Sequence, residues 1–282
     1  TNSFLSFYPT IGIILNIEED HLDYYKDLDD IKSAFREFVS YVPENGFIIV
    51  NSDNKNCMDV LDNAKGKVIT IGIDNKKADF YADNIRYTKE GMLFDVVVDE
   101  ICYPDICIPL MGVHQAKNCA LAFGLCKELL PKLDFAAVKK KLRELDWPGR
   151  MEIVGNRPFV LLDACINTES CQNVKQVLKH LGISNVTLIV GIPDDKDYAG
   201  VVKNMRELAG KIFLTKSANP HYRFTGVQKE YLEKQGIKVS WTESVEEAIL
   251  RAQSLEEPII ILGTTSVVAE VKRFFEKNSN ES

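Results

Sequence analysis

Apolar runs of strand length alternate along the chain with segments whose apolar residues recur every three to four positions. A helical repeat of this kind carries Ile31, Ala34, Phe35, Phe38 and Val39. In the first half the pattern predicts strands at 11–15, 47–51, 67–72, 80–87, 92–98 and 106–110, and helices at 116–130 and 135–145. This order predicts an α/β domain with an antiparallel flank.

The second half begins at Trp147-Pro148-Gly149-Arg150, where two strong helix breakers stand together, so we expect domains at 1–147 and 148–282. Beyond this point, strands are predicted at 159–162, 186–190, 212–215, 239–241 and 259–262, with helical patterns between them. Strands joined through helices form a parallel sheet, which predicts a Rossmann-like, doubly wound domain. Ligands of such domains bind at the carboxyl ends of the strands.

Composition narrows the possible functions. The sequence contains no apolar run near the roughly 20 residues that span a bilayer, which argues against a membrane protein. A net charge of -7 argues against a nucleic-acid partner. The basic run Lys139-Lys140-Lys141 is interpreted as a solvated helix face. Seven cysteines without metal-site spacing are interpreted as reduced thiols, which predicts a cytoplasmic location.

Three polar clusters follow apolar strands or open helices. Residues 16–23 combine Asn16, His21 and four acids, a set that suits Mg²⁺ or phosphate, although an acidic helix start would look the same. Two other clusters could bind a nucleotide or have a structural role only. Residues 51–54, which include Asp53, could form a plain turn, and His114, in the helix start that runs to Asn118, could be a helix cap.

The stretch from Ser3 to Ile31, with Asn16-Ile17-Glu18-Glu19-Asp20-His21-Leu22-Asp23 at its centre, resembles the central ATP-binding domain of the Mur ligase superfamily, in particular of UDP-N-acetylmuramate:L-alanine ligases. The resemblance implies that His21 is a ligand of an active-site Mg²⁺, with Asn16 and Asp23 beside it. Gly112 to Asn118 resembles the family's Gly-x-His-Asn-x-x-Asn signature, with Gln115 in place of the first Asn. This implies that His114 and Asn118 contact the nucleotide base and that Asp53 belongs to a nucleotide-binding turn.

The second half resembles the glutamate ligase domain of folylpolyglutamate synthases more closely. The matching segments are Trp147 to Glu152, Leu161 to Asp163, Val190 to Tyr198 and Gly263-Thr264. The resemblance implies that Arg150, Asp163 and Lys196 act on ATP, and that Asn167 and Thr264 serve the substrates. A guanidinium suits phosphate because it forks onto two oxygens and stays charged.

Two departures from the family pattern stand out. Ile166 replaces the histidine that the relatives associate with the incoming amino acid, and an alkyl side chain can neither donate a hydrogen bond nor take a proton. No Gly-x-x-x-x-Gly-Lys-Ser/Thr phosphate loop occurs in the chain, which opens at Thr1 without an initiator Met. We therefore expect an N-terminally truncated central domain that is inactive by itself.

The resemblance implies an ADP-forming ligase that uses ATP and Mg²⁺ to join a carboxylate to an amino acid through an acyl phosphate. Alanine addition to a nucleotide-linked sugar acid, in peptidoglycan synthesis, is the first expectation. Glutamate addition to a folate-like carboxylate and a catalytically inactive binding module are the alternatives.

Overall fold

The computed structural model describes residues 2–19, 24–88, 91–130 and 132–279. These residues form two compact units. Unit 1 comprises the described parts of 1–88, 92–108 and 114–143, and unit 2 comprises Gly91, 109–113 and the described part of 144–282. The domain boundary expected at residues 147 and 148 stays a prediction.

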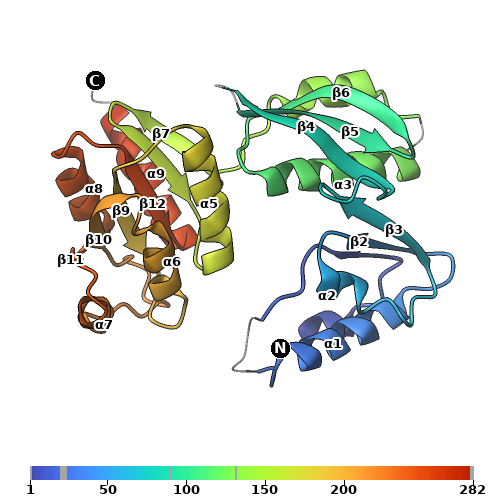
Figure 1. The fold of residues 1–282 in the computed structure, drawn as a ribbon, viewed down its shortest axis with the longest axis horizontal. Coiled ribbons are helices and arrows are strands. Elements are labelled where there is room, and N and C mark those ends of the chain that lie inside the picture. Colours follow the sequence, from blue (N-terminus) through green and yellow to red (C-terminus); the bar gives the residue numbers. More distant parts are fainter. Residues whose placement is uncertain (1, 20–23, 89–90, 131, 280–282) are drawn as a thin grey trace. The chain divides into compact units, whose positions relative to one another are not determined.

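Unit 1 is built on a six-stranded sheet in the order β1-β2-β3-β4-β5-β6 (Figure 1). The strands are β1 (Ile11–Ile14), β2 (Phe47–Asn51), β3 (Lys67–Gly72), β4 (Phe80–Thr88), β5 (Gly91–Val98) and β6 (Ile101–Ile108). β1 to β4 pair in parallel, and β5 and β6 pair antiparallel, which confirms the mixed α/β prediction. β6 begins earlier than predicted. Its first half is largely exposed and carries Pro104, so the sequence has no apolar run there that would predict a strand.

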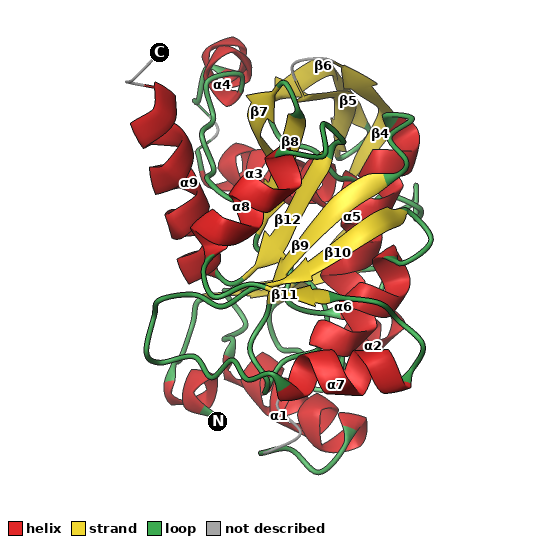
Figure 2. Cartoon of the chain, turned by 90° about the vertical axis from the view of Figure 1, so that its left-hand side faces the viewer, coloured by secondary structure: helices red, strands yellow, loops and turns green. Residues whose placement is uncertain are grey.

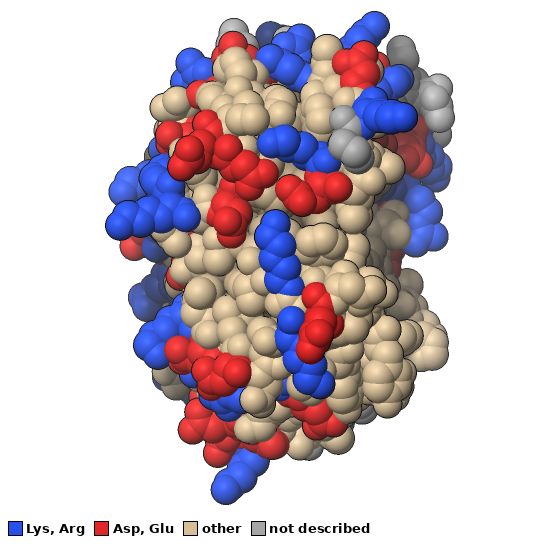
Figure 3. All heavy atoms as spheres, turned by 90° about the vertical axis from the view of Figure 1, so that its right-hand side faces the viewer, with Lys and Arg blue, Asp and Glu red and all other residues tan. Residues whose placement is uncertain are grey.

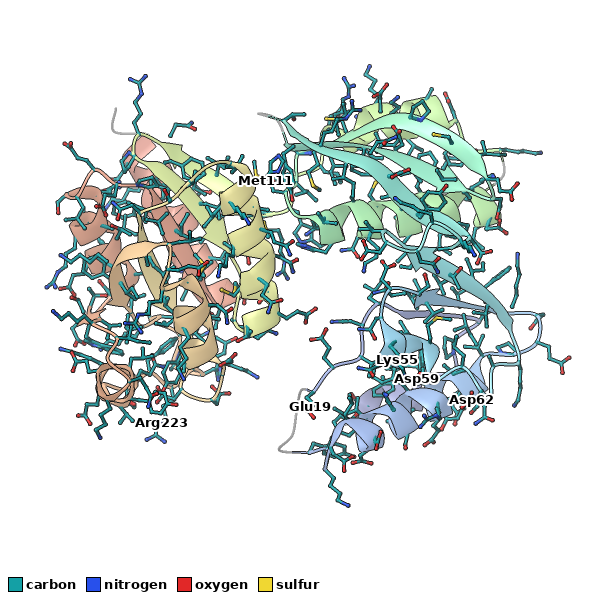
Figure 4. The ribbon with its side chains drawn as sticks, in the orientation of Figure 1. Glu19, Lys55, Asp59, Asp62, Met111 and Arg223 are labelled. Atoms are coloured by element: carbon teal, nitrogen blue, oxygen red, sulfur yellow. The ribbon has the colours of Figure 1, made fainter. Side chains whose placement is uncertain are left out.

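Helices pack against the parallel strands and against the antiparallel flank of this sheet. They are η1 (Ser3–Ser6), α1 (Leu28–Tyr41), α2 (Lys55–Met58), α3 (Val113–Leu129) and α4 (Phe135–Leu142). Ile14, Ile48 and Val50 pack against the apolar face of α1, as its helical repeat predicts. Asp59 ties α1 to α2, since its carboxylate lies 3.0 Å from Lys32 Nζ and 2.9 Å from Lys55 Nζ (Figure 4).

Unit 2 is a doubly wound sheet in the order β11-β10-β9-β12-β8-β7. Its strands are β7 (Glu152–Asn156), β8 (Phe159–Asp163), β9 (Val186–Gly191), β10 (Ala209–Leu214), β11 (Ser240–Trp241) and β12 (Ile259–Gly263). All of these pairings are parallel except that of β7 with β8. The predicted Rossmann-like architecture is confirmed.

Helices lie on both faces of the second sheet (Figures 1 and 2). They are α5 (Thr168–His180), α6 (Tyr198–Met205), α7 (Val227–Lys234), α8 (Val245–Gln253) and α9 (Thr265–Ser279). The β-strand core packs against α8 and α9 through residues such as Ile261, Ile249 and Val267. α7, α9 and β7 are additions to the predicted pattern. The valine-rich start of α9 explains its omission, because β-branched residues are more typical of strands.

No helix among the described residues has the length and apolar character needed to cross a membrane. On the face of the chain drawn in Figure 3, acidic and basic side chains are intermingled. Lys139, from the basic run on α4, donates to the carbonyl of Pro104 at 2.6 Å. Part of that run therefore anchors α4 to β6, in addition to forming a solvated face.

Candidate functional site

Two asparagine side chains, one at the end of β2 and one in α2, donate to the segment that follows β1. Asn51 is buried at 4% exposure; its Nδ2 donates to the Leu15 carbonyl at 2.8 Å and its Oδ1 accepts from the Asp53 N–H at 3.1 Å. Asn56 Nδ2 donates to the Ile17 carbonyl at 2.9 Å. These bonds fix the segment on both sides of Asn16, whose own side chain is exposed.

Asp53 is held by three partners. Its Oδ2 accepts from the Ile73 N–H at 2.8 Å, and its Oδ1 accepts from the Asn75 N–H at 2.9 Å. Lys117 Nζ lies 3.8 Å from the same carboxylate, and both side chains are largely buried. Asp53 thus closes the turn after β3 and brings it alongside the first turns of α3.

α3 presents the other residues expected at the nucleotide base. It begins directly after Gly112, whose φ of +100° is a conformation that favours glycine. His114 and Asn118 are both half-buried and lie one helical turn apart. Asn118 Nδ2 lies 3.4 Å from Gln115 Oε1. Gln115, which replaces the asparagine of the signature, thus contacts Asn118, which matches it.

The metal-binding prediction rests on residues outside the described ones. His21, together with Asp20 and Asp23, falls in the undescribed segment 20–23. Among the residues that are described, no group of three or more His, Cys, Asp or Glu side chains could hold a metal ion. Binding of Mg²⁺ by His21 therefore stays a prediction.

In unit 2, Asp163 ends β8 in a buried position with 5% exposure. Its Oδ2 accepts from the Met151 N–H at 2.9 Å. Burial raises the pKa of Asp163 to about 6, against the lowering effects of the Met151 N–H and of the charge on Arg150. The side chain of Arg150 is exposed. The structure therefore places a buried carboxyl group beside an exposed guanidinium.

Asn167 lies at the start of α5, where its Oδ1 accepts from the Ser170 N–H at 2.9 Å. Asp197, from the segment after β9, accepts from Thr168 Oγ1 at 2.6 Å and from the Gly200 N–H at 2.8 Å. One carboxylate thus holds the first turns of α5 and α6 together, which suits the partial positive charge of helix N-termini. Ile166, where the relatives carry histidine, is half-buried.

Lys196 and Thr264 complete the predicted set. Lys196 is half-buried in the turn before α6, where its N–H donates to the Pro193 carbonyl at 3.1 Å. Thr264 is 5% exposed, and its Oγ1 accepts from the Val267 N–H at 3.4 Å in the first turn of α9. Gly263, before it, allows close approach of β9, since a Cβ there would lie 2.6 Å from the Gly191 carbonyl oxygen.

The loop after β9 contains a second carboxylate with several partners. Asp194 accepts from Thr225 Oγ1 at 2.9 Å and from Gln228 Nε2 at 2.8 Å, and Arg223 Nε lies 3.8 Å away (Figure 4). Gln228 is buried. Asp194 therefore fixes the loop that leads to Lys196.

Asp163 is expected to make stability depend on pH. Because its pKa rises from 3.8 to about 6 on folding, its protonated form stabilises the protein fully below about pH 4, and this contribution is lost as pH rises through 6. The shift corresponds to about 3 kcal/mol. Urea unfolding from pH 4 to 7 should show the native chain losing about this much relative to Asp163→Asn. Parallel pH profiles of the two proteins would contradict the assignment.

Family models match both halves of the chain. The Mur ligase middle domain matches residues 2–126, and the Mur ligase glutamate ligase domain matches residues 149–266. The UDP-N-acetylmuramate--L-alanine ligase of Caldicellulosiruptor bescii is 42% identical over 130 residues, which are 45% of this chain and 28% of that protein. The ligase of the same name from Caldicellulosiruptor saccharolyticus is 36% identical over 194 residues, 67% of this chain and 42% of that protein. The matches thus span less than half of either relative.

Solved structures share the fold. A folylpolyglutamate synthase of Mycobacterium tuberculosis, complexed with ADP and AMPPCP, has a TM-score of 0.83 at 21% identity and covers 96% of this chain and 65% of its own. A UDP-N-acetylmuramate-alanine ligase of Thermotoga maritima has a TM-score of 0.72 at 19% identity and covers 100% of this chain and 62% of its own. At these identities the similarity is one of fold.

Proposed function

Because the chain is a member of the Mur ligase family, carrying its middle domain followed by its glutamate ligase domain, we propose that it is part of an ADP-forming carboxylate–amine ligase. The amine we assign is L-alanine and the acid is UDP-N-acetylmuramate. The observation that carries this choice is the 42% identity over 130 residues to a UDP-N-acetylmuramate--L-alanine ligase.

The reaction is a phosphoryl transfer followed by an acyl transfer. A carboxylate oxygen of the acid attacks the γ-phosphorus of ATP, the bond to the bridging oxygen breaks, and ADP leaves. The neutral amine nitrogen then attacks the acyl carbon, phosphate leaves with the C–O electron pair, and the nitrogen loses a proton. Such chemistry depends mostly on placement and on neutralising the charge of the phosphoryl group.

In this proposal the residues of each unit have separate tasks. His114 and Asn118 contact the base, while Asn16 lies on the segment that leads to the metal residue His21. Arg150 binds phosphate oxygens through a forked guanidinium, and Lys196 adds a second cation. Asp163 accepts a hydrogen bond from the nucleotide.

Asn167 and Thr264 act on the amino-acid side, through the first turns of α5 and α9 that they cap. Mg²⁺, when bound, would offset the charge of the triphosphate. The reaction is assigned to the cytoplasm, where ATP is supplied.

The function is tested by phosphate release from the protein that carries this chain. We expect release that requires ATP, UDP-N-acetylmuramate and L-alanine together, with a product heavier than the acid by one alanyl residue. The 282-residue chain by itself is expected to release no phosphate, because it contains no Gly-x-x-x-x-Gly-Lys-Ser/Thr loop. Release by the isolated chain, or release without the sugar acid, would contradict the proposal.

A second candidate is a glutamate ligase that acts on a folate-like carboxylate. It is favoured by the segment Trp147-Pro148-Gly149-Arg150 and by the TM-score of 0.83 to a folylpolyglutamate synthase. The same assay separates the two, since glutamate and a folate replace alanine and the sugar acid. Turnover with that pair alone would establish the second candidate, and absence of turnover with either pair would favour a binding module.

A further inference from the structure

The backbone of the turn that carries Arg150 adopts an uncommon conformation. Gly149 has a φ of +69° and Met151 a φ of +50°, so both neighbours of Arg150 are in the left-handed region. A residue with a side chain is disfavoured there and persists only where its surroundings hold it. Met151 is also buried, at 5% exposure. The turn is therefore held in place by other parts of unit 2.

Three hydrogen bonds fix this turn from β7, β8 and the residue after β8. The Gly149 N–H donates to Glu152 Oε2 at 2.7 Å, and the Gly149 carbonyl accepts from the Ala164 N–H at 2.8 Å. The Met151 N–H donates to Asp163 Oδ2 at 2.9 Å. Every one of these bonds involves a neighbour of Arg150, while the guanidinium itself stays exposed. The main chain is thus ordered and the functional group remains available.

α9 supports the turn from the far end of the sequence. Val268 fills the space beside Gly149, where an added Cβ would lie 2.5 Å from Val268 Cγ1. Lys272 Nζ donates to Glu152 Oε1 at 2.7 Å, and both side chains are only 24% exposed. The pKa of Lys272 is raised, first by this hydrogen bond. Glu152 thus uses one oxygen for Lys272 and the other for the Gly149 N–H.

The ion pair also affects the charge near Arg150. Glu152 stands two residues from Arg150, and an uncompensated carboxylate there would compete with phosphate for the guanidinium. Lys272 neutralises that carboxylate and fixes its rotamer. Loss of Lys272 therefore has two consequences, a looser turn and a competing anion, and both act on Arg150.

We propose that Glu152 and Lys272 are positioning residues that hold Arg150 for binding the phosphate groups of the nucleotide. This inference rests on the proposed ligase function. Misplacement of a substrate-contacting group by about 1 Å costs up to about 10²-fold in rate. We expect Lys272→Met to lower kcat/KM for ATP about 10- to 100-fold, and Lys272→Arg, which keeps the donor, to restore most of the loss.

The test is a double-mutant cycle with Arg150→Ala in the protein that carries this chain. If Lys272 acts through Arg150, Lys272→Met should lower kcat/KM in the native background and change it less than about 2-fold in the Arg150→Ala background. Lys277→Met, which removes an exposed lysine from the same helix, is the matched control and should leave kcat/KM unchanged. Hydrogen exchange of the Gly149 N–H should accelerate in Lys272→Met and not in the control.

Each outcome decides the inference. An equal fall in both backgrounds, or unchanged kcat/KM in Lys272→Met, overturns the positioning role and leaves the ligase function standing. Absence of turnover in the native protein overturns the ligase function instead. In that case the affinity for AMPPCP is measured for the same variants. If Lys272→Met lowers this affinity equally in the native and Arg150→Ala backgrounds, the positioning role is overturned. A loss of affinity confined to the native background supports the role.

Discussion

Arg150→Ala is expected to lower kcat/KM for ATP by about 10²- to 10³-fold in the protein that carries this chain, the range typical of losing a preorganised group that stabilises transition-state charge. The physical reason is that the phosphoryl group carries its charge on oxygens that a guanidinium can bind two at a time. The fixed turn around Arg150 limits compensation by other side chains. Steady-state phosphate release over a range of ATP concentrations measures the effect.

The matched control is Arg273→Ala, which removes an exposed arginine from α9 and should leave kcat/KM within about 2-fold, as is usual for surface substitutions. Arg150→Lys should recover only part of the loss, since an ammonium cannot form the forked pair. Full activity in Arg150→Lys would show that charge alone matters. Full activity in Arg150→Ala would remove Arg150 from the site.

Most of the fold follows from short-range patterns in the sequence. Ile14, Ile48 and Val50 stand in continuous apolar runs, and these runs became the parallel strands of unit 1. α9 could not be predicted in this way, because Val267, Val268 and Val271 favour strands by local propensity. Tertiary burial against β12 outweighs that preference, and such packing cannot be detected by a local pattern.

Sequence motifs were enough to propose some residues of the candidate site, whereas contacts between residues far apart in the sequence could be found only in the structure. Arg150 and Asp163 were proposed as site residues from segments that resemble known relatives, and in the structure Met151, the residue after Arg150, donates its N–H to Asp163. Lys272 lies 120 residues from Glu152 in the sequence, so no spacing rule links them. Asp197 lies in the segment from Val190 to Tyr198 that carries the resemblance, but no role of its own followed from the sequence. Its contact with Thr168 depends on how α5 and α6 pack.

Asp53→Ala is expected to destabilise unit 1 by about 3 to 6 kcal/mol, because it removes a carboxylate that accepts from two backbone N–H groups, each such charged bond contributing roughly 1.5 to 3 kcal/mol. The N–H groups of Ile73 and Asn75 would lose their acceptor, and Lys117 its counter-ion. Asp53→Asn keeps one acceptor and should cost about half as much. Urea unfolding followed by circular dichroism measures both.

The same variants decide whether Asp53 binds the nucleotide or only orders the turn after β3. Both carboxylate oxygens already accept from the protein backbone, so we expect folded Asp53→Asn, assayed at low temperature, to bind AMPPCP within about 3-fold of the native affinity while its unfolding midpoint falls. Asp74→Ala, which removes an exposed carboxylate from the neighbouring turn, should change neither quantity. A tenfold loss of affinity with stability intact would instead place Asp53 in direct contact with the nucleotide, because an ordering residue cannot weaken binding without loosening the turn that it orders.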